Sequence, residues 1–127
     1  TLRKSQALMS AALNIVVIDD NSTNRLLPGL FLRPLGHAVN ECVGAEEALE
    51  WLMHNPCDVI LLDISMPSVS GLQLCKQLRA DQRYQHLQII AYTAHAMPDE
   101  VLLWESSGFD KVLLKPIRKD DLLALFS

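Results

Sequence analysis

The feature that most constrains the fold is an apolar run, Val59 to Leu62, that ends abruptly in the carboxylate of Asp63. An unbroken apolar run of this length, bounded by turn residues, is typical of a strand buried on both faces, as in a parallel sheet. Such a strand carries Asp63 to its C-terminal end. In open α/β sheets, sites form in the crevice outside those strand ends. The run therefore predicts both an architecture and the place of a site.

Two more apolar runs end in polar groups in the same way. Residues 15–18 are followed by Asp19 and Asp20, and residues 112–114 are followed by Lys115. If the three strands are neighbours, three carboxylates and one ammonium group converge on one small site.

Strand and helix patterns alternate along the 127 residues. Strands are expected at about 14–18, 37–42, 59–62, 87–92 and 111–114. Helices are expected at about 22–35, 44–54, 71–80, 94–107 and 118–126. Alternation with short connections predicts an α/β fold, a doubly wound five-stranded parallel sheet with five helices on both faces. Residues 1–12 are expected to be a linker or extension, and 13–127 the folded domain of a longer protein.

The first expected helix contains Pro28, which loses a backbone hydrogen bond and clashes one turn back, at a cost of about 3 kcal/mol. We therefore expect a kink or a late helix start. The apolar face of this helix is expected to consist of Leu26, Leu27, Leu30 and Phe31.

The fourth expected helix has four consecutive large apolar residues, Val101 to Trp104. One helix face can bury only some of them. Val101 and Trp104 fit an inward stripe. Leu102 and Leu103 are then exposed and suited to a partner, or they pack beneath a loop or against the last helix.

Composition excludes several classes of function. The formal net charge is −4, so no broad basic patch argues for nucleic acid. No apolar run approaches the roughly 20 residues that a membrane-spanning helix needs. Cys42, Cys57 and Cys75 lack metal-site spacing, and we expect them to be reduced and buried, as in a cytosolic protein.

Three clustered carboxylates raise one another's pKa unless a cation neutralises them. The usual remedy is a hard divalent cation such as Mg²⁺, which prefers oxygen ligands. Lys115 at the same place is either a structural ion pair or the partner of an anionic group on Asp63. Thr93 is either a helix cap or a hydroxyl donor to a phosphoryl oxygen. The Lys115–Pro116 bond is a candidate cis peptide.

These motifs together resemble the receiver domain of two-component response regulators. The matching segments are Val17-Ile18-Asp19-Asp20-Asn21, Asp63-Ile64-Ser65-Met66-Pro67, Gly71, Thr93-Ala94 and Lys115-Pro116-Ile117. The likeness covers about residues 13–126, in the family's order and spacing. Asn24-Arg25 and residues 92–97 most resemble receivers attached to hybrid sensor histidine kinases. The resemblance implies a flavodoxin-like sheet with strand order 2-1-3-4-5.

The resemblance also implies a role for each site residue. Asp63 would be the phosphoacceptor, a carboxylate nucleophile that forms an aspartyl phosphate. Thr93 and Lys115 would bind the phosphoryl oxygens. The ligands of Mg²⁺ would be Asp63, Asp20 directly, Asp19 through water or as a close support, and the backbone carbonyl of Ser65.

The implied partners are a histidine kinase or a histidine phosphotransfer domain that donates the phosphoryl group. An attached kinase or output domain is expected, as is a dimer through the fourth helix, the fifth strand and the last helix. The domain would accept a phosphoryl group and not turn over a substrate, whatever the activity of the parent chain. The expected location is the cytoplasm, with a parent that is free or membrane-anchored. The domain itself would bind neither nucleic acid nor membrane.

The sequence departs from the family at Val112, where an aromatic residue normally turns inward on phosphorylation. Valine is small and stiff, so it cannot make the same rotamer change. Tyr92 lies on the wrong strand for a simple swap. This departure is compatible with a second function, that of a receiver-like interaction module that signals without phosphorylation.

A phosphatase and a flavin binder fit the sequence less well. A Mg²⁺-dependent phosphatase would need an acid two residues after Asp63, where Ser65 stands. A flavin binder would need a glycine-rich phosphate loop and would place the flavin phosphate against acidic strand ends.

Overall fold

The computed structural model describes residues 12–64, 71–94 and 97–125. Its centre is one parallel sheet of five strands in the order β2-β1-β3-β4-β5, which confirms the predicted α/β architecture and strand order. The strands are β1 (Asn14–Ile18), β2 (Ala38–Cys42), β3 (Val59–Asp63), β4 (Gln88–Thr93) and β5 (Lys111–Leu114). Strands β1, β3 and β4 are almost wholly buried, as their unbroken apolar runs predict.

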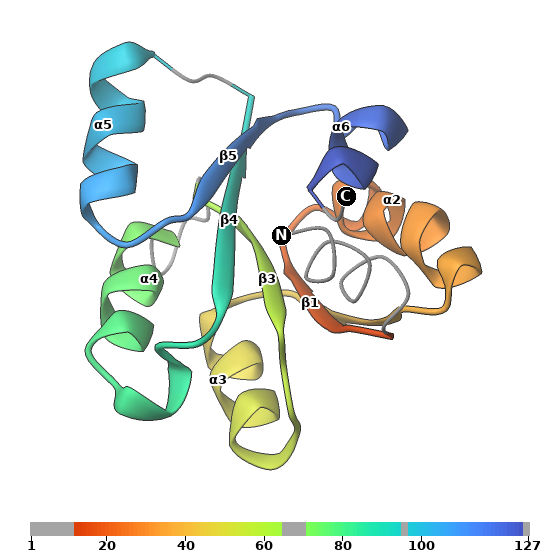
Figure 1. Cartoon of the computed structure of the whole chain (residues 1–127), viewed down its shortest axis with the longest axis horizontal. Coiled ribbons are helices and arrows are strands. Elements are labelled where there is room, and N and C mark those ends of the chain that lie inside the picture. Colours follow the sequence, from red (N-terminus) through yellow and green to blue (C-terminus); the bar gives the residue numbers. More distant parts are fainter. Residues whose placement is uncertain (1–11, 65–70, 95–96, 126–127) are drawn as a thin grey trace, which may run out of the picture.

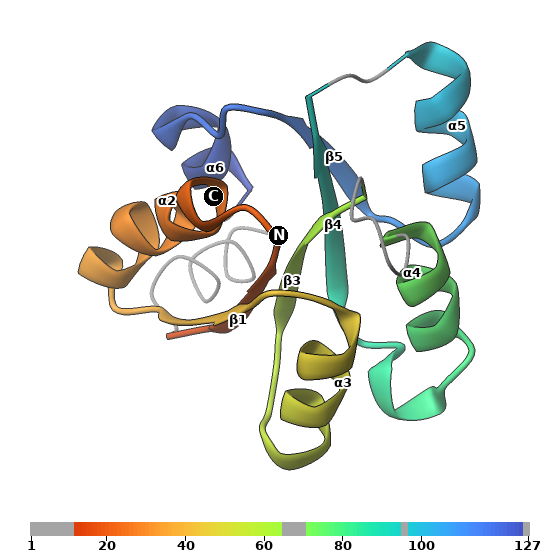
Figure 2. The same cartoon turned by 180° about the vertical axis from the view of Figure 1, so that it is seen from behind.

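Helices cover both faces of the sheet (Figures 1 and 2). The α-helices of the described residues are α2 (Ser22–Leu32), α3 (Ala45–His54), α4 (Gly71–Arg79), α5 (Pro98–Ser106) and α6 (Lys119–Ala124). Short 3₁₀ turns, η1 (Arg33–Leu35) and η2 (Gln82–Tyr84), precede β2 and β4. Helices α2 and α6 lie on one face, and α3, α4 and α5 lie on the other. No helix of the described residues is long and apolar enough to cross a membrane.

Two apolar cores result, because successive strand residues point to opposite faces. Val16, Ile60 and Ile89 belong to the core under α3, α4 and α5, whereas Val17 and Leu61 belong to the core under α2 and α6. The sheet thus holds its strand ends rigidly between two packed layers.

Helix α2 differs from its prediction in two ways. It begins at Ser22, with the Asn21 side chain accepting a hydrogen bond from the backbone N–H of Asn24, so the late start is wrong and Pro28 lies inside the helix. The predicted apolar face is also wrong in part, because Leu26 and Leu30 are exposed. The buried residues of this helix are Pro28, Gly29 and Leu32.

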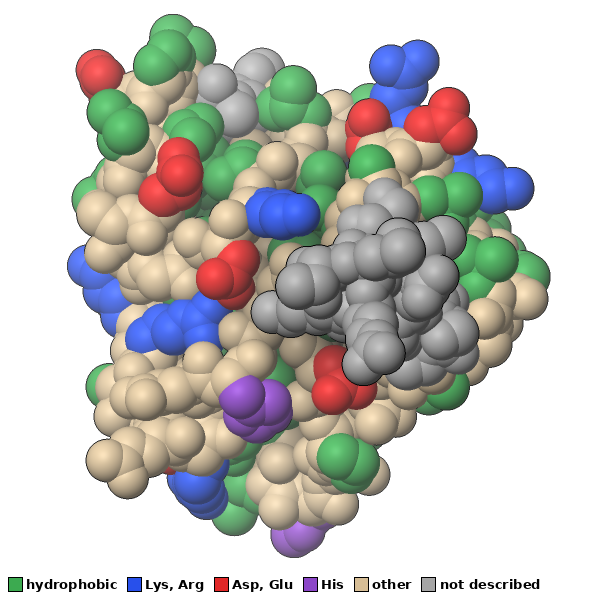
Figure 3. Space-filling view, in the orientation of Figure 1, with side chains coloured by type: hydrophobic (Ala, Val, Ile, Leu, Met, Phe, Trp, Pro, Cys, Tyr) green, Lys and Arg blue, Asp and Glu red, His purple; other side chains and the backbone are tan. Residues whose placement is uncertain are grey.

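Helix α5 begins at Pro98 and not at Ala94, because proline suits the first turn, where its missing N–H would lack a helical partner. Trp104 is buried, and Val101 packs against the same core. Leu102 and Leu103 are 67% and 50% exposed, which confirms the predicted exposure of these two side chains. Figure 3 shows apolar surface over α5, while charges of both signs are interspersed over the visible face.

Candidate functional site

The carboxyl ends of β1 and β3 bring the acidic residues together. Ile18 pairs with Leu62 in the register of the two strands, so Asp19 and Asp63 follow at the same edge of the sheet. One carboxylate oxygen from each of Asp19, Asp20 and Asp63 lies within 4.8 Å of the others. Asp19 and Asp63 are 0% and 2% exposed, whereas Asp20 is exposed. Two buried charges therefore share a small site that opens to solvent at Asp20.

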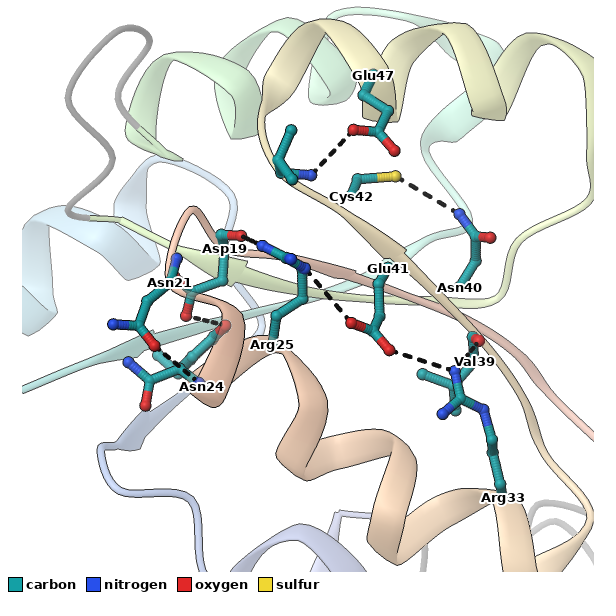
Figure 4. Close-up of polar contacts among 12 residues, drawn as sticks. Asp19, Asn21, Asn24, Arg25, Arg33, Val39, Asn40, Glu41, Cys42 and Glu47 are labelled. Carbon is teal, nitrogen blue, oxygen red and sulfur yellow. Dashed lines mark hydrogen bonds and ion pairs between the residues drawn. The ribbon is translucent and has the colours of Figure 1, made fainter.

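Hydrogen bonds to both the side chain and the backbone of Asp19 fix its position (Figure 4). Its Oδ1 accepts a hydrogen bond from the backbone N–H of Asn21 at 2.8 Å, and its backbone carbonyl accepts one from the Arg25 guanidinium at 2.9 Å. Arg25 is in turn paired with Glu41 of β2 at 3.4 Å, and Glu41 also pairs with Arg33 at 3.5 Å. Helix α2 is thereby tied to the edge strand β2 immediately beside the acidic cluster.

Lys115 brings the positive charge to the site. Its ammonium nitrogen lies 3.3 Å from Asp63 Oδ2 and 3.5 Å from Asp19 Oδ2. Its backbone N–H donates to the carbonyl of Thr93 at 2.7 Å, which fixes the end of β5 against β4. The Lys115–Pro116 bond, the candidate from the sequence, is cis.

Thr93 is the last residue of β4 and is buried. It pairs with Leu114 of β5, and it follows Tyr92, which is the register partner of Asp63, so Thr93 lies at the same edge of the sheet as Asp63. Helix α5 begins only at Pro98, with Met97 at its N-cap, so Thr93 is not the cap of that helix. Ser65, the predicted backbone ligand of Mg²⁺, lies outside the described residues.

Gly71 lets α4 begin directly against the end of β3. A Cβ atom at this position would lie 2.7 Å from the backbone oxygen of Asp63 and 2.7 Å from the Cα of Ile64. Contacts this close require the backbone to shift. The close approach of α4 to Asp63 therefore explains why the sequence motif has a glycine at position 71.

Tyr92 is the site residue that sequence reasoning missed. It is fully buried in β4, it pairs with Asp63, and its hydroxyl donates to Asp19 Oδ2 at 2.5 Å. Burial, followed by the adjacent Asp19 carboxylate, raises the pKa of the phenol well above its usual range, so the hydroxyl stays protonated as a donor. The sequence did contain one indication of this role: Tyr92 places a hydroxyl group in an otherwise apolar, buried strand, one residue before Thr93.

The donor set suits a hard divalent cation. Three carboxylates face one ammonium group, so the protein's own charges leave an excess of negative charge among oxygen donors, which is the environment that Mg²⁺ prefers. The exposed side chain of Asp20 provides access from solvent.

Comparisons with known proteins agree with this geometry. The model of the response regulator receiver domain family matches residues 15–127. The chain is 32% identical over 110 residues to the CAI-1 autoinducer sensor kinase/phosphatase CqsS of Vibrio cholerae, and 34% identical over 118 residues to the sensor protein GacS of Pseudomonas syringae. These matches cover 86% and 91% of the chain but only 16% and 13% of the relatives. The chain thus spans a small part of their length.

Solved structures of receiver proteins share the fold over most of the chain. The chemotaxis protein CheY4 of Vibrio cholerae superposes with a TM-score of 0.85 at 25% identity, covering 91% of this chain and 96% of that one. A response regulator from Chloroflexus aurantiacus gives a TM-score of 0.84 at 26% identity, covering 91% of this chain and 94% of that one.

Proposed function

Because the chain belongs to the receiver domain family of two-component response regulators, we propose that Asp63 is its phosphoacceptor. The observation that best supports this role is the ion pair between Lys115 and Asp63, formed beside Asp19 and Asp20. A carboxylate that is both almost buried and matched by a cation is positioned for a reaction that adds negative charge to it.

The proposed reaction is a transfer from a phosphohistidine. One carboxylate oxygen of Asp63 attacks the phosphorus atom, an O–P bond forms, and the P–N bond breaks with its electron pair leaving to the imidazole. Phosphoryl transfer depends mainly on positioning and on charge neutralisation. Lys115 supplies a positive charge 3.3 Å from the nucleophilic carboxylate, and the hydroxyl of Thr93 is assigned to a phosphoryl oxygen.

Receiver domains generally bind Mg²⁺ at an acidic pocket, and we assign that role here to Asp19, Asp20, Asp63 and the backbone carbonyl of Ser65. Asp20 would bind the ion directly, and Asp19 would act through water or as a close support. Both oxygens of Asp19 already accept hydrogen bonds from the protein, which favours the supporting role. When bound, the ion would neutralise negative charge on the phosphoryl group.

Chemical trapping tests the assignment of Asp63. After incubation with acetyl phosphate and Mg²⁺, borohydride reduces an aspartyl phosphate to homoserine, and peptide mass spectrometry identifies the residue changed. We expect homoserine only in place of Asp63. Homoserine at Asp19 or Asp20, with Asp63 intact, would contradict the assignment.

Binding of beryllofluoride, a mimic of the phosphoryl group, distinguishes the receiver from an interaction module that signals without phosphate. Val112, in place of the family's aromatic residue, is what favours such a module. Binding that requires Mg²⁺ is expected of the phosphoacceptor. A folded chain that binds Mg²⁺ but no beryllofluoride would favour the module.

We further propose that the phosphoryl donor is a histidine kinase or a histidine phosphotransfer domain, and that residues 13–127 form the receiver domain, with 1–12 as a linker from the rest of a hybrid kinase. Leu102 and Leu103 of α5 and Leu114 of β5 are large apolar side chains that are exposed, which supports a partner or a dimer contact that involves these two elements. The free, buried thiols of the chain support a cytoplasmic location.

A further inference from the structure

Tyr92 contacts both of the charged groups that flank Asp63. Its hydroxyl donates to Asp19 Oδ2 at 2.5 Å, and the Lys115 ammonium lies 4.9 Å from the centre of its ring. Its position in β4 is fixed by pairing with Asp63 on β3, and its side chain is fully buried. One rigid aromatic side chain therefore lies beneath the acidic cluster and beneath its cation.

The hydroxyl completes the set of hydrogen bonds that orients Asp19. Oδ1 of this carboxylate is fixed by the N–H of Asn21, and Oδ2 also lies 3.5 Å from the Lys115 ammonium, a longer contact that leaves the carboxylate some freedom to turn. The bond from Tyr92 to Oδ2 closes this freedom. Because Asp19 has no solvent exposure, water cannot readily replace the phenol as a donor.

The ring has a separate effect on Lys115. A cation over the face of a tyrosine ring within about 6 Å is attracted by the ring's quadrupole. The Lys115 side chain is only 15% exposed, so the attraction acts in a partly desolvated place. The same ring thus favours the ammonium position from which Lys115 reaches both Asp63 and Asp19.

We infer that Tyr92 is a positioning residue of the phosphoacceptor site, its hydroxyl orienting Asp19 for Mg²⁺ and its ring holding Lys115 beside Asp63. This inference rests on the proposed function, because Tyr92 can have this role only at a site that binds Mg²⁺ and accepts a phosphoryl group. This role differs from that of the family's aromatic residue, which turns inward on phosphorylation. The Tyr92 ring is already buried, its hydroxyl is bonded to Asp19 and its face contacts Lys115.

The first test is the Mg²⁺ affinity of Tyr92→Phe, measured by titration calorimetry without any phosphodonor. This change removes the hydroxyl and keeps the ring. Loss of an outer hydrogen bond to a ligand group typically lowers metal affinity 10- to 100-fold, so we expect an increase in Kd of about tenfold or more. Because Lys115 keeps the ring beside it, the change in Mg²⁺ affinity reports on the hydroxyl alone.

Tyr92→Leu removes the ring as well. We expect it to share the weakened Mg²⁺ binding and also to lower the phosphorylation rate at saturating Mg²⁺ by roughly 2- to 30-fold, the range that a lost cation–π contact corresponds to. Should this variant fail to fold, Tyr92→Phe alone decides the role of the hydroxyl.

Two comparisons separate positioning from a general loss of packing. Tyr84→Phe is the matched control, because the other tyrosine of the chain lies in η2 before β4, at the opposite end of that strand. It should leave Mg²⁺ affinity unchanged. In an Asp19→Ala background, which removes the acceptor of the phenol's hydrogen bond, Tyr92→Phe should have no further effect on Mg²⁺ affinity, because the hydroxyl acts through that carboxylate.

A Kd for Mg²⁺ in folded Tyr92→Phe within about twofold of the wild-type value would overturn the inference. So would a full effect of Tyr92→Phe in the Asp19→Ala background. Either result would leave the proposed function intact if the wild-type chain is still phosphorylated at Asp63. Failure of the wild-type chain to bind Mg²⁺ would instead overturn the proposed metal site, and the role of Tyr92 with it.

Discussion

At the scale of single residues, the position of Asp63 depends on the glycine at position 71, which has no Cβ atom. Helix α4 starts where a Cβ atom would be 2.7 Å from the backbone oxygen of Asp63. The obstructing atoms belong to the backbone, so no rotamer change can relieve the contact. The end of β3 and the start of α4 must therefore separate if any larger residue occurs there.

Gly71→Ala is expected to lower the free energy of unfolding by about 1–3 kcal/mol, the usual cost of overpacking a buried position. It should also slow phosphorylation by displacing Asp63. Urea unfolding and a phosphorylation time course measure the two effects. Gly44→Ala is the control, since a Cβ atom there meets nothing within 4 Å, and it should change the stability by less than about 1 kcal/mol. Equal stability of the two variants would refute the steric argument.

At the scale of elements, α2 buries a face that differs from the one predicted from its sequence. The apolar periodicity of the sequence suggested Leu26 and Leu30 for the inner face, yet both are exposed. The helix instead buries Pro28, Gly29 and Leu32. Of these, Leu32 belongs to the core that contains Val17 and Leu61 of the sheet. Polar anchors, such as Arg25 paired with Glu41 of β2, then fix its rotation.

The rotation of α2 can be tested with one substitution at two positions. Leu32→Ala removes a fully buried side chain and should cost about 2–5 kcal/mol of unfolding free energy. Leu30→Ala, at a side chain that is 62% exposed, should change it by about 0.5 kcal/mol or less. Denaturant unfolding of both variants gives the comparison. A larger loss for Leu30→Ala would mean that α2 packs with the opposite face inward.

At the scale of the whole molecule, the reactivity of the three cysteines tests the packing of one of the two cores. Cys42, Cys57 and Cys75 all lie in the core beneath α3, α4 and α5. Burial raises the pKa of each thiol from its ordinary value of 9.0, to about 11 for Cys42 and Cys75 and to about 12 for Cys57. Both exclusion of solvent and suppression of the thiolate protect them from reagents.

The native chain at pH 8 should therefore react with iodoacetamide far more slowly than the chain in urea, where all three thiols are accessible. Mass spectrometry over time counts the modified cysteines. Rapid modification of any of them in the native chain, with its fold intact by circular dichroism, would contradict the packing of this core.

The same pKa shifts set a direction for stability at high pH. Above pH 9 the unfolded chain loses its thiol protons while the folded chain keeps them, so the unfolded state binds fewer protons and stability falls as pH rises toward 11. Unfolding midpoints between pH 8 and 11 measure this slope. Cys75→Ala should make it shallower, and an unchanged slope would show that this thiol does not contribute.

Whether a feature could be predicted from the sequence depends on how far apart in the chain the interacting residues lie. The unbroken apolar run of β3 and its terminal Asp63 were sufficient to predict the central strand and the edge of the sheet that holds the acidic residues. The hydrogen bond of Tyr92 was not predictable, because it joins Tyr92 of β4 to Asp19, which directly follows β1, and these two strands are not adjacent. The burial of α2 was not predictable from periodicity, because apolar spacing does not register polar contacts such as the ion pair of Arg25 with Glu41 of β2.

The measurement that tests the central claim most directly is intact mass after incubation with acetyl phosphate, with and without Mg²⁺. We predict a Mg²⁺-dependent gain of one phosphoryl group, which is absent in Asp63→Asn. Asp58→Asn, at the other end of the same strand run, should retain the gain, since an amide oxygen can still accept the bond from the N–H of Asn14. The same gain in Asp63→Asn as in the wild-type chain would contradict the account.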